Sequence, residues 1–252
     1  TYKNLIAING TTGNWRDSGE GLGGGVYAAD DNVAWMQTAL KSIENIIFYS
    51  HTNIPVNITS EELSKIIVSW QEVGDKFFKI SLGVEEIRER LKRYYEWLEA
   101  QEPEKAEILL DEELEGIKLR DFLYENKVPS SLKNGFRYYA LSLDKKGKKI
   151  GVVNSDVGVF RLFNEDLKIE EIEELLEPFL LPYAFGGLLL SDIGVVIANP
   201  MLTETDGNSA YLMFSEKKYH GSVIWSGHSA MLVLGIIRQL RTHPHSQFLR
   251  TA

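Results

Sequence analysis

The sequence predicts a mainly α-helical protein that contains one β-hairpin. Apolar residues recur at helical spacing through most of the first 126 residues and again near the C-terminus. Between Phe136 and Phe163 the period changes from about 3.6 to about 2, and aromatic and β-branched residues dominate, as they do in strands. We find no internal repeat, low-complexity linker or domain boundary, so we expect residues 1–252 to form a single domain.

The first predicted helix runs from Asp31 to Phe48, and we expect it to be mostly buried. Asp30 or Asp31 is placed to act as its N-cap, which would put a carboxylate beside a glycine-rich tract that ends at Gly25. The apolar residues expected to face the core are Trp35, Met36, Ala39, Leu40, Ile43, Ile46 and Ile47.

Three further helical segments are expected before the strands. Thr59 and Glu62 have the spacing of a capping box, which opens an amphipathic helix that extends to Phe77. A second helix spans about Val84 to Ala100, and its many charged residues predict a solvated, ion-paired outer face. The acidic segment from Pro103 to Asn126 is also predicted to be helical.

The predicted hairpin has strands at Phe136–Leu143 and Ile150–Phe163, joined by a loop in which Gly147 is left-handed. An amphipathic helix follows around residues 169–179, and its crowded glutamates are expected to lie in solvent. The last helix, Ser229 to Leu240, is apolar on nearly every side and is therefore expected to be buried.

Composition excludes several classes of function. The formal net charge of −9 argues against a general nucleic-acid binder and against attraction to an anionic membrane. No cysteine is present, and no apolar run approaches the roughly 20 residues that a membrane span needs. His243 and His245 lack suitable partners for a metal, so we expect neither metal nor cofactor. A soluble protein follows, whether cytoplasmic or periplasmic.

Two stretches carry the residues best suited to chemistry. The first, from Gly13 to Gly25, places an aromatic ring, a guanidinium and two carboxylates before a tract with five glycines between Gly19 and Gly25. Its spacing fits no phosphate-binding loop, and the alternative is an exposed loop whose tryptophan fills the core. The second, from Tyr219 to His228, places four ring side chains around two glycines. Core packing is the alternative role for Trp225, and a structural role is the expectation for His228.

Three motifs, in the order found there, resemble the six-hairpin (α/α)-toroid glycosidases, above all the glucosidase domain of glycogen-debranching enzymes and related bacterial α-glucosidases. Trp15-Arg16-Asp17-Ser18 stands where that family has Trp-Met-Asp-Ala. The segment from Gly25 to Trp35 is similar to its glycine turn, in which an asparagine opens an apolar helix. Tyr219 to Trp225 is similar to its Tyr-His-x-Gly-Thr-Val-Trp. The resemblance implies an (α/α) hairpin toroid, part of an (α/α)6 barrel, with a small β-hairpin insertion.

The chain departs from the family in three ways. Ser226-Gly227-His228 stands where the family continues with Pro-Trp. The Glu-Leu segment that carries the family's second catalytic carboxylate is not found before Ala252, and only about half of the twelve toroid helices can be counted. We therefore expect a part of a larger enzyme, whose general base is not identified in this chain.

The resemblance implies an inverting glycoside hydrolase that acts on α-glucosides or glucose oligosaccharides. Such an enzyme needs a protonated acid and a carboxylate base roughly 6.5–9.5 Å apart, with a water molecule between the base and the sugar. Asp17 is the expected acid and Glu20 the second candidate. Arg16 would lower the pKa of Asp17 if the two paired, so we expect Arg16 to point toward a sugar hydroxyl or toward Glu20.

The remaining site residues would bind the sugar. Aromatic faces and polar groups for this purpose are expected from Trp15, Arg16, Tyr27, Asp31, Asn32, Tyr219, His220 and Trp225. The segment from Asn154 to Asp156 is similar to a polar segment near the family's cleft, or is a plain turn. A toroid should bring the two stretches to one pocket.

Two other functions stay open at this point. One is a non-catalytic carbohydrate-binding or assembly module on the same fold. The other is a toroid isomerase or epimerase, which is ranked last because only His220 and His228 are available to face a cavity.

Overall fold

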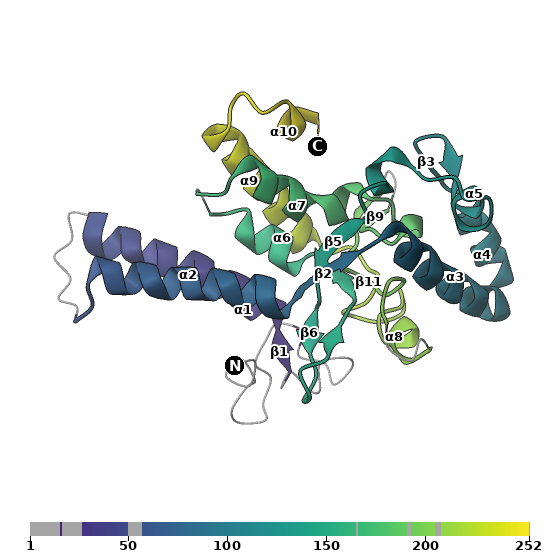
Figure 1. Ribbon diagram of the computed structural model, residues 1–252, viewed down its shortest axis with the longest axis horizontal. Helices are drawn as coiled ribbons and strands as arrows, with labels where there is room; N and C mark the ends of the chain where they lie inside the picture. The colour runs from purple at the N-terminus through teal and green to yellow at the C-terminus, as the bar shows by residue number, and fades with distance from the viewer. Residues whose placement is uncertain are drawn as a thin grey trace.

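The computed structural model describes Arg16 and residues 27–49, 57–164, 166–190, 193–204 and 208–251. The protein is mainly α-helical, with 57% helix and only short strands, which confirms the predicted class. In Figure 1 the helices α1 and α2 form a long hairpin that projects from the rest of the molecule, while α3, α4 and α5 lie on the opposite side of the short strands.

The projecting hairpin consists of α1 (Asp30–Glu44), its π-helical extension η2 (Asn45–Tyr49) and α2 (Ser60–Phe77). The predicted capping box is present, since the backbone N–H of Glu62 donates to Thr59 Oγ1 and the N–H of Thr59 donates to Glu62 Oε2.

The predicted burial of α1 is wrong, because the face expected to be buried is exposed and another face is buried. Trp35 and Ile46 are each 49% exposed, and Met36 and Ile43 are exposed as well. The buried face instead carries Val33, Ala34 and Gln37, because α1 packs against α2 and α6 along that stripe. A helix with apolar residues around most of its circumference does not reveal which side meets a partner.

Of the two helices predicted between Val84 and Asn126, the first is observed and the second is split into two shorter helices. α3 is the charged amphipathic helix expected from about Val84. The helix expected at Pro103–Asn126 is interrupted by a tight turn, in which Glu115 and Gly116 have φ values of 54° and 75°. The elements are β2 (Lys79–Leu82), α3 (Val84–Gln101), α4 (Pro103–Leu110), β3 (Glu113–Leu114), β4 (Ile117–Lys118), α5 (Leu119–Tyr124) and η3 (Ser130–Leu132).

The predicted hairpin exists but is shorter. β6 (Ser142–Leu143) pairs with β7 (Lys149–Ile150) around a turn in which Gly147 has a φ of 81°, as expected. β6 also pairs with β1 (Ala28–Ala29). β5 (Phe136–Tyr139) pairs with β2, and β8 (Val153–Asn154) pairs with β11 (Ala198–Asn199), so both join strands distant in the sequence.

The second strand was predicted to reach Phe163, but residues 156–161 form the helix α6 (Asp156–Arg161). Every residue of α6 is buried. A short run that is buried on all sides has the same apolar composition in a helix and in a strand, and periodicity does not separate the two.

The C-terminal third completes the molecule with α7 (Ile169–Leu180), η4 (Tyr183–Phe185), β9 (Leu189–Leu190), β10 (Gly194–Val195), α8 (Asn208–Met213), α9 (Ser226–Thr242) and α10 (Gln247–Thr251). α9 was expected to be buried on all sides, yet Val233 and Leu234 are each 55% exposed. Its buried face packs on α6, where a Cβ at Gly235 would lie 2.7 Å from Leu162 Cβ. The face of α9 that the described residues cover is the one with Leu232, Gly235 and Gln239.

One large apolar core joins α3, α5 and α7 to the strands. Across the described residues, no helix is both long enough and apolar enough to cross a bilayer.

Candidate functional site

Buried polar side chains gather where three helices begin. Asp30 is the first residue of α1, Asp156 is the first residue of α6, and His228 lies in the first turn of α9. α6 packs against both α1 and α9. His228 Nε2 lies 3.5 Å from Asp156 Oδ1. The side chains of His228 and Asp156 are 8% and 1% exposed and Asp30 is buried, so this is a buried polar cluster rather than a solvated surface.

Arg16 connects this cluster to the two stretches identified in the sequence. Its Nε donates to Asp156 Oδ2 at 2.9 Å and its Nη2 donates to Asp156 Oδ1 at 3.1 Å. Its Nη1 donates to the carbonyl of His220 and its Nη2 to the carbonyl of Ile197. Residues 204 positions apart are thus in direct contact, which brings together one residue of each stretch, Arg16 and His220. A pocket shared by the two stretches stays a prediction.

The burial of Arg16 argues against its expected contact with a sugar hydroxyl, while its expected approach to Glu20 stays a prediction. The side chain was expected to reach toward a sugar hydroxyl or Glu20, but it is only 1% exposed and its described partners are Asp156 and backbone carbonyls. A buried guanidinium requires a carboxylate and acceptors to offset its lost hydration. Trp15, Asp17 and Glu20 lie outside the described residues.

Asn154 connects the carboxyl group of Asp30 to the backbone of Asp156. Its Nδ2 donates to Asp30 Oδ2 at 2.9 Å and to the carbonyl of Tyr139, while its Oδ1 accepts from the backbone N–H of Asp156. The segment from Asn154 to Asp156 therefore belongs to the cluster and is more than a plain turn.

The two carboxyl groups have opposite pKa shifts. Burial raises the pKa of Asp30 well above its usual value, and the negative charges of Asp156 and Asp31 act in the same direction. Burial would also raise the pKa of Asp156, but Arg16 and His228 together hold it below its usual value. Neighbouring carboxyls whose pKa values are pushed apart can hold one proton between them at neutral pH.

Aromatic rings extend from the cluster to the surface. The ring centroids of Tyr219 and Trp225 lie 4.8 Å apart, and the centroid of Trp225 lies 6.1 Å from that of His228. Tyr219 is 67% exposed and Trp225 is half-buried, whereas His220 is buried. Rings of this kind can offer a flat apolar face to a sugar.

The other expected binding residues lie at the start of α1. Tyr27, just before β1, is half-buried, Asp31 is buried and Asn32 is exposed. The backbone N–H of Asn32 donates to Asp31 Oδ1 at 2.7 Å. Asn32 thus lies at the surface, while the side chain of Asp31 accepts a hydrogen bond in the first turn of the helix.

Sequence reasoning missed Asp30 and Asp156 as members of one cluster and gave His228 a purely structural role. For Asp30 the available signal was its place at the start of a predicted helix, where anionic side chains are stabilised. Asp156 was assigned to a predicted strand, so no such signal was available for it. Nothing in the sequence indicates that the three helix starts meet.

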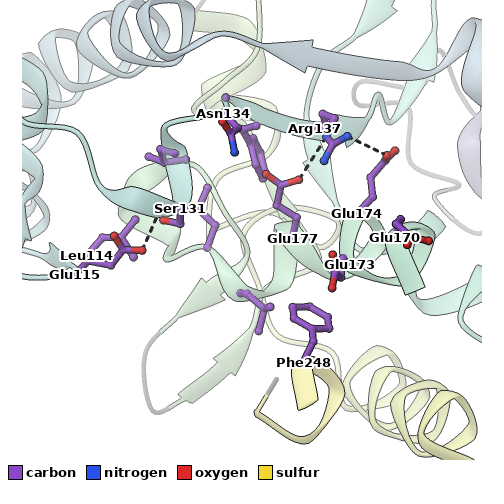
Figure 2. A pocket seen from close by; sticks show the side chains of 15 residues that line it. Leu114, Glu115, Ser131, Asn134, Arg137, Glu170, Glu173, Glu174, Glu177 and Phe248 are labelled. Carbon is purple, nitrogen blue, oxygen red and sulfur yellow. Dashed lines mark hydrogen bonds and ion pairs between the residues drawn. The ribbon is translucent and has the colours of Figure 1, made fainter. Parts of the chain in front are cut away.

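A cavity lined by described residues lies elsewhere, between α7 and the segment from η3 to β5 (Figure 2). Its volume is about 650 Å³, and it shares no residue with the buried cluster. Burial raises the pKa of Glu177 to about 7. Arg137 lies between Glu174 and Glu177, whose side chains are only 15% and 26% exposed. Glu174 was expected to lie in solvent, and that expectation is wrong. The other acidic lining residues are Glu115, Glu170 and Glu173.

Among the residues placed by the structure, no group of three or more His, Asp or Glu side chains is arranged to hold a metal ion. Comparisons with protein-family models, with curated proteins and with solved structures gave no match to this chain. The assignment of a function therefore rests on the residues and their contacts.

Proposed function

We propose that this chain is part of an α-glucoside hydrolase that acts on α-glucosides or glucose oligosaccharides with inversion of configuration. The observation that carries the proposal is the contact of Arg16 with both Asp156 and the His220 carbonyl. Through that contact Arg16 of the first motif lies beside His220 of the second, although the two residues are 204 positions apart in the sequence. The contact supports the proposal because it joins one residue from each of the two motifs that resemble the glycosidase family.

Asp17 is the proposed general acid and Glu20 the second candidate. Arg16, next to Asp17 in the chain, is already paired with Asp156, and this pairing offsets its charge. A compensated guanidinium lowers the pKa of a neighbouring carboxyl less than a free one, which favours an Asp17 that keeps its proton. Asp30, Asp156 and Arg16 are buried and act as positioning residues in this proposal. The general base comes from a carboxylate not identified in this chain.

The toroid architecture belongs to the same proposal. α1 and α2 form a helical hairpin, which is the repeating unit of such a fold. The apolar stripes exposed on α1 (Trp35, Met36, Ile43) and on α9 (Val233, Leu234, Ile237) are suitable for packing against neighbouring hairpins. The sugar would contact Tyr219, Trp225 and Asn32 near the starts of α9 and α1.

The test is the Asp17→Asn variant of the complete enzyme, assayed with a malto-oligosaccharide and with α-glucosyl fluoride. Loss of a general acid should slow hydrolysis of the oligosaccharide roughly 10²–10⁴-fold, and should slow that of the fluoride much less, because fluoride leaves without a proton. Asp166→Asn is the matched control, since Asp166 is 67% exposed on the surface and should leave both rates unchanged. Equal loss on both substrates would reject Asp17 as the acid.

The alternative is a non-catalytic carbohydrate-binding or assembly module. This alternative would be favoured if neither the chain alone nor the full-length product of its gene hydrolysed a glucoside, while both still bound maltotriose in calorimetry. Absence of both hydrolysis and binding would reject the carbohydrate assignment altogether.

A further inference from the structure

A small internal cavity lies beneath the first two turns of α1. It is lined by α1, α2, α6 and the strand β5, and it leaves about 10 Å³ of room for the centre of a water-sized sphere. That is enough for one water molecule and too little for an organic ligand. All of its lining residues are buried: Asp30, Val33, Ala34, Gln37, Gly74, Phe78, Tyr139, Val157 and Arg161.

Three polar atoms from these lining residues have no hydrogen-bond partner among the residues that the structure describes. They are Asp30 Oδ1, Gln37 Oε1 and Arg161 Nε. The rest of each side chain is held in place, because Asp30 Oδ2 accepts from Asn154, Gln37 Nε2 donates to the carbonyl of Trp70, and Arg161 Nη1 donates to Tyr139 Oη. Leaving a buried polar atom unpaired costs about 1–3 kcal/mol, so three around one cavity would be expensive.

We propose that this cavity is the binding site of one internal water molecule, which joins Asp30 of α1, Gln37 of α1 and Arg161 of α6. The donors and acceptors match. Arg161 Nε donates to the water, the water donates to Gln37 Oε1, and the carboxyl of Asp30, when protonated, donates from Oδ1 to the water's second lone pair. Three hydrogen bonds are typical of a buried water. The burial that raises the pKa of Asp30 favours the protonated form.

The bound water has a consequence for the buried cluster. It would complete a chain of hydrogen bonds from Arg161 through Asp30 and Asn154 to the N-terminus of α6 at Asp156. A neutral Asp30 with a satisfied proton can lie beside the ionised Asp156 without strong repulsion. The water therefore fixes the start of α1, whether or not the protein is a hydrolase.

A crystal structure at about 1.6 Å provides the first test. We expect a single water oxygen within about 3.2 Å of Asp30 Oδ1, Gln37 Oε1 and Arg161 Nε. An empty cavity, or side chains rearranged so that the three atoms bond to one another, would overturn the proposal.

Water ¹⁷O magnetic relaxation dispersion provides a second test in solution, because it counts long-lived internal waters. Gln37→Leu removes the acceptor and should lower the count by one relative to the wild type. Thr38→Val is the matched control, since Thr38 is the next residue of α1 and does not line the cavity. Asp30→Asn keeps a donor toward the water and should retain it. An unchanged count in Gln37→Leu would contradict the assignment.

Discussion

Replacing Asp156 by Asn tests the central contact of the cluster. Asp156 is 1% exposed and holds the guanidinium of Arg16 through two hydrogen bonds, at 2.9 and 3.1 Å. The amide of Asn has nearly the same shape but no charge, and it can offer only one acceptor where the carboxylate offers two. The variant thus leaves Arg16 buried with an uncompensated charge.

The expected cost follows from this burial. Breaking a buried ion pair by removing one partner typically costs about 3–5 kcal/mol. Asn retains one acceptor, and the loss of the Asp156 charge relieves its repulsion of Asp30, so we expect the lower end of that range, about 3 kcal/mol. For a domain of roughly this size the thermal midpoint should fall by about 6–12 °C.

The assay is urea or thermal unfolding of the wild type, Asp156→Asn, Arg16→Met and the double variant. Because both single changes break the same pair, the double variant should lose clearly less than the sum of the two single losses. Asp166→Asn, at an exposed ion pair with Lys41, serves as the control and should change stability by less than about 0.5 kcal/mol. Strict additivity, or a cost below about 1 kcal/mol for Asp156→Asn, would refute the description of a buried pair.

Two further predictions concern α7 and α6. Burial raises the pKa of Glu177 from 4.5 to about 7, so the folded state holds a proton on this carboxyl more tightly than the unfolded state does. The contribution of Glu177 to the free energy of unfolding is therefore fully present below about pH 4.5 and is lost as the pH rises toward 7. With allowance for partial exposure, Glu177→Gln should gain about 1–2 kcal/mol relative to the wild type between pH 5 and pH 8 in urea unfolding, and a pH-independent difference would contradict this. Gly158→Ala should destabilise by about 1–3 kcal/mol, because its Cβ would lie 2.3 Å from a ring carbon of Phe179. At Gly227 a Cβ would meet no described atom within 4 Å, so Gly227→Ala should be near neutral in thermal unfolding, and equal costs for the two variants would reject the packing argument.

The sequence by itself determined the local features of this protein. The capping box of Thr59 and Glu62 and the hairpin turn at Gly147 were predicted and are present. Each depends on residues only a few positions apart, whose hydrogen bonds or backbone angles follow from side-chain chemistry alone. The mainly helical class also follows from the period of the apolar residues.

Only the tertiary structure decided which faces are buried and which polar groups meet. The sequence of α1 offers apolar residues on two sides, and packing against α2 and α6 selected the side with Val33 and Ala34 over the side with Trp35. The Asp30–Asn154–Asp156–Arg16 cluster spans about 140 residues of sequence, and no periodicity encodes its assembly. The physical reason is that a buried charge is stable only with its partner, and the partner is brought by the packing of distant helices.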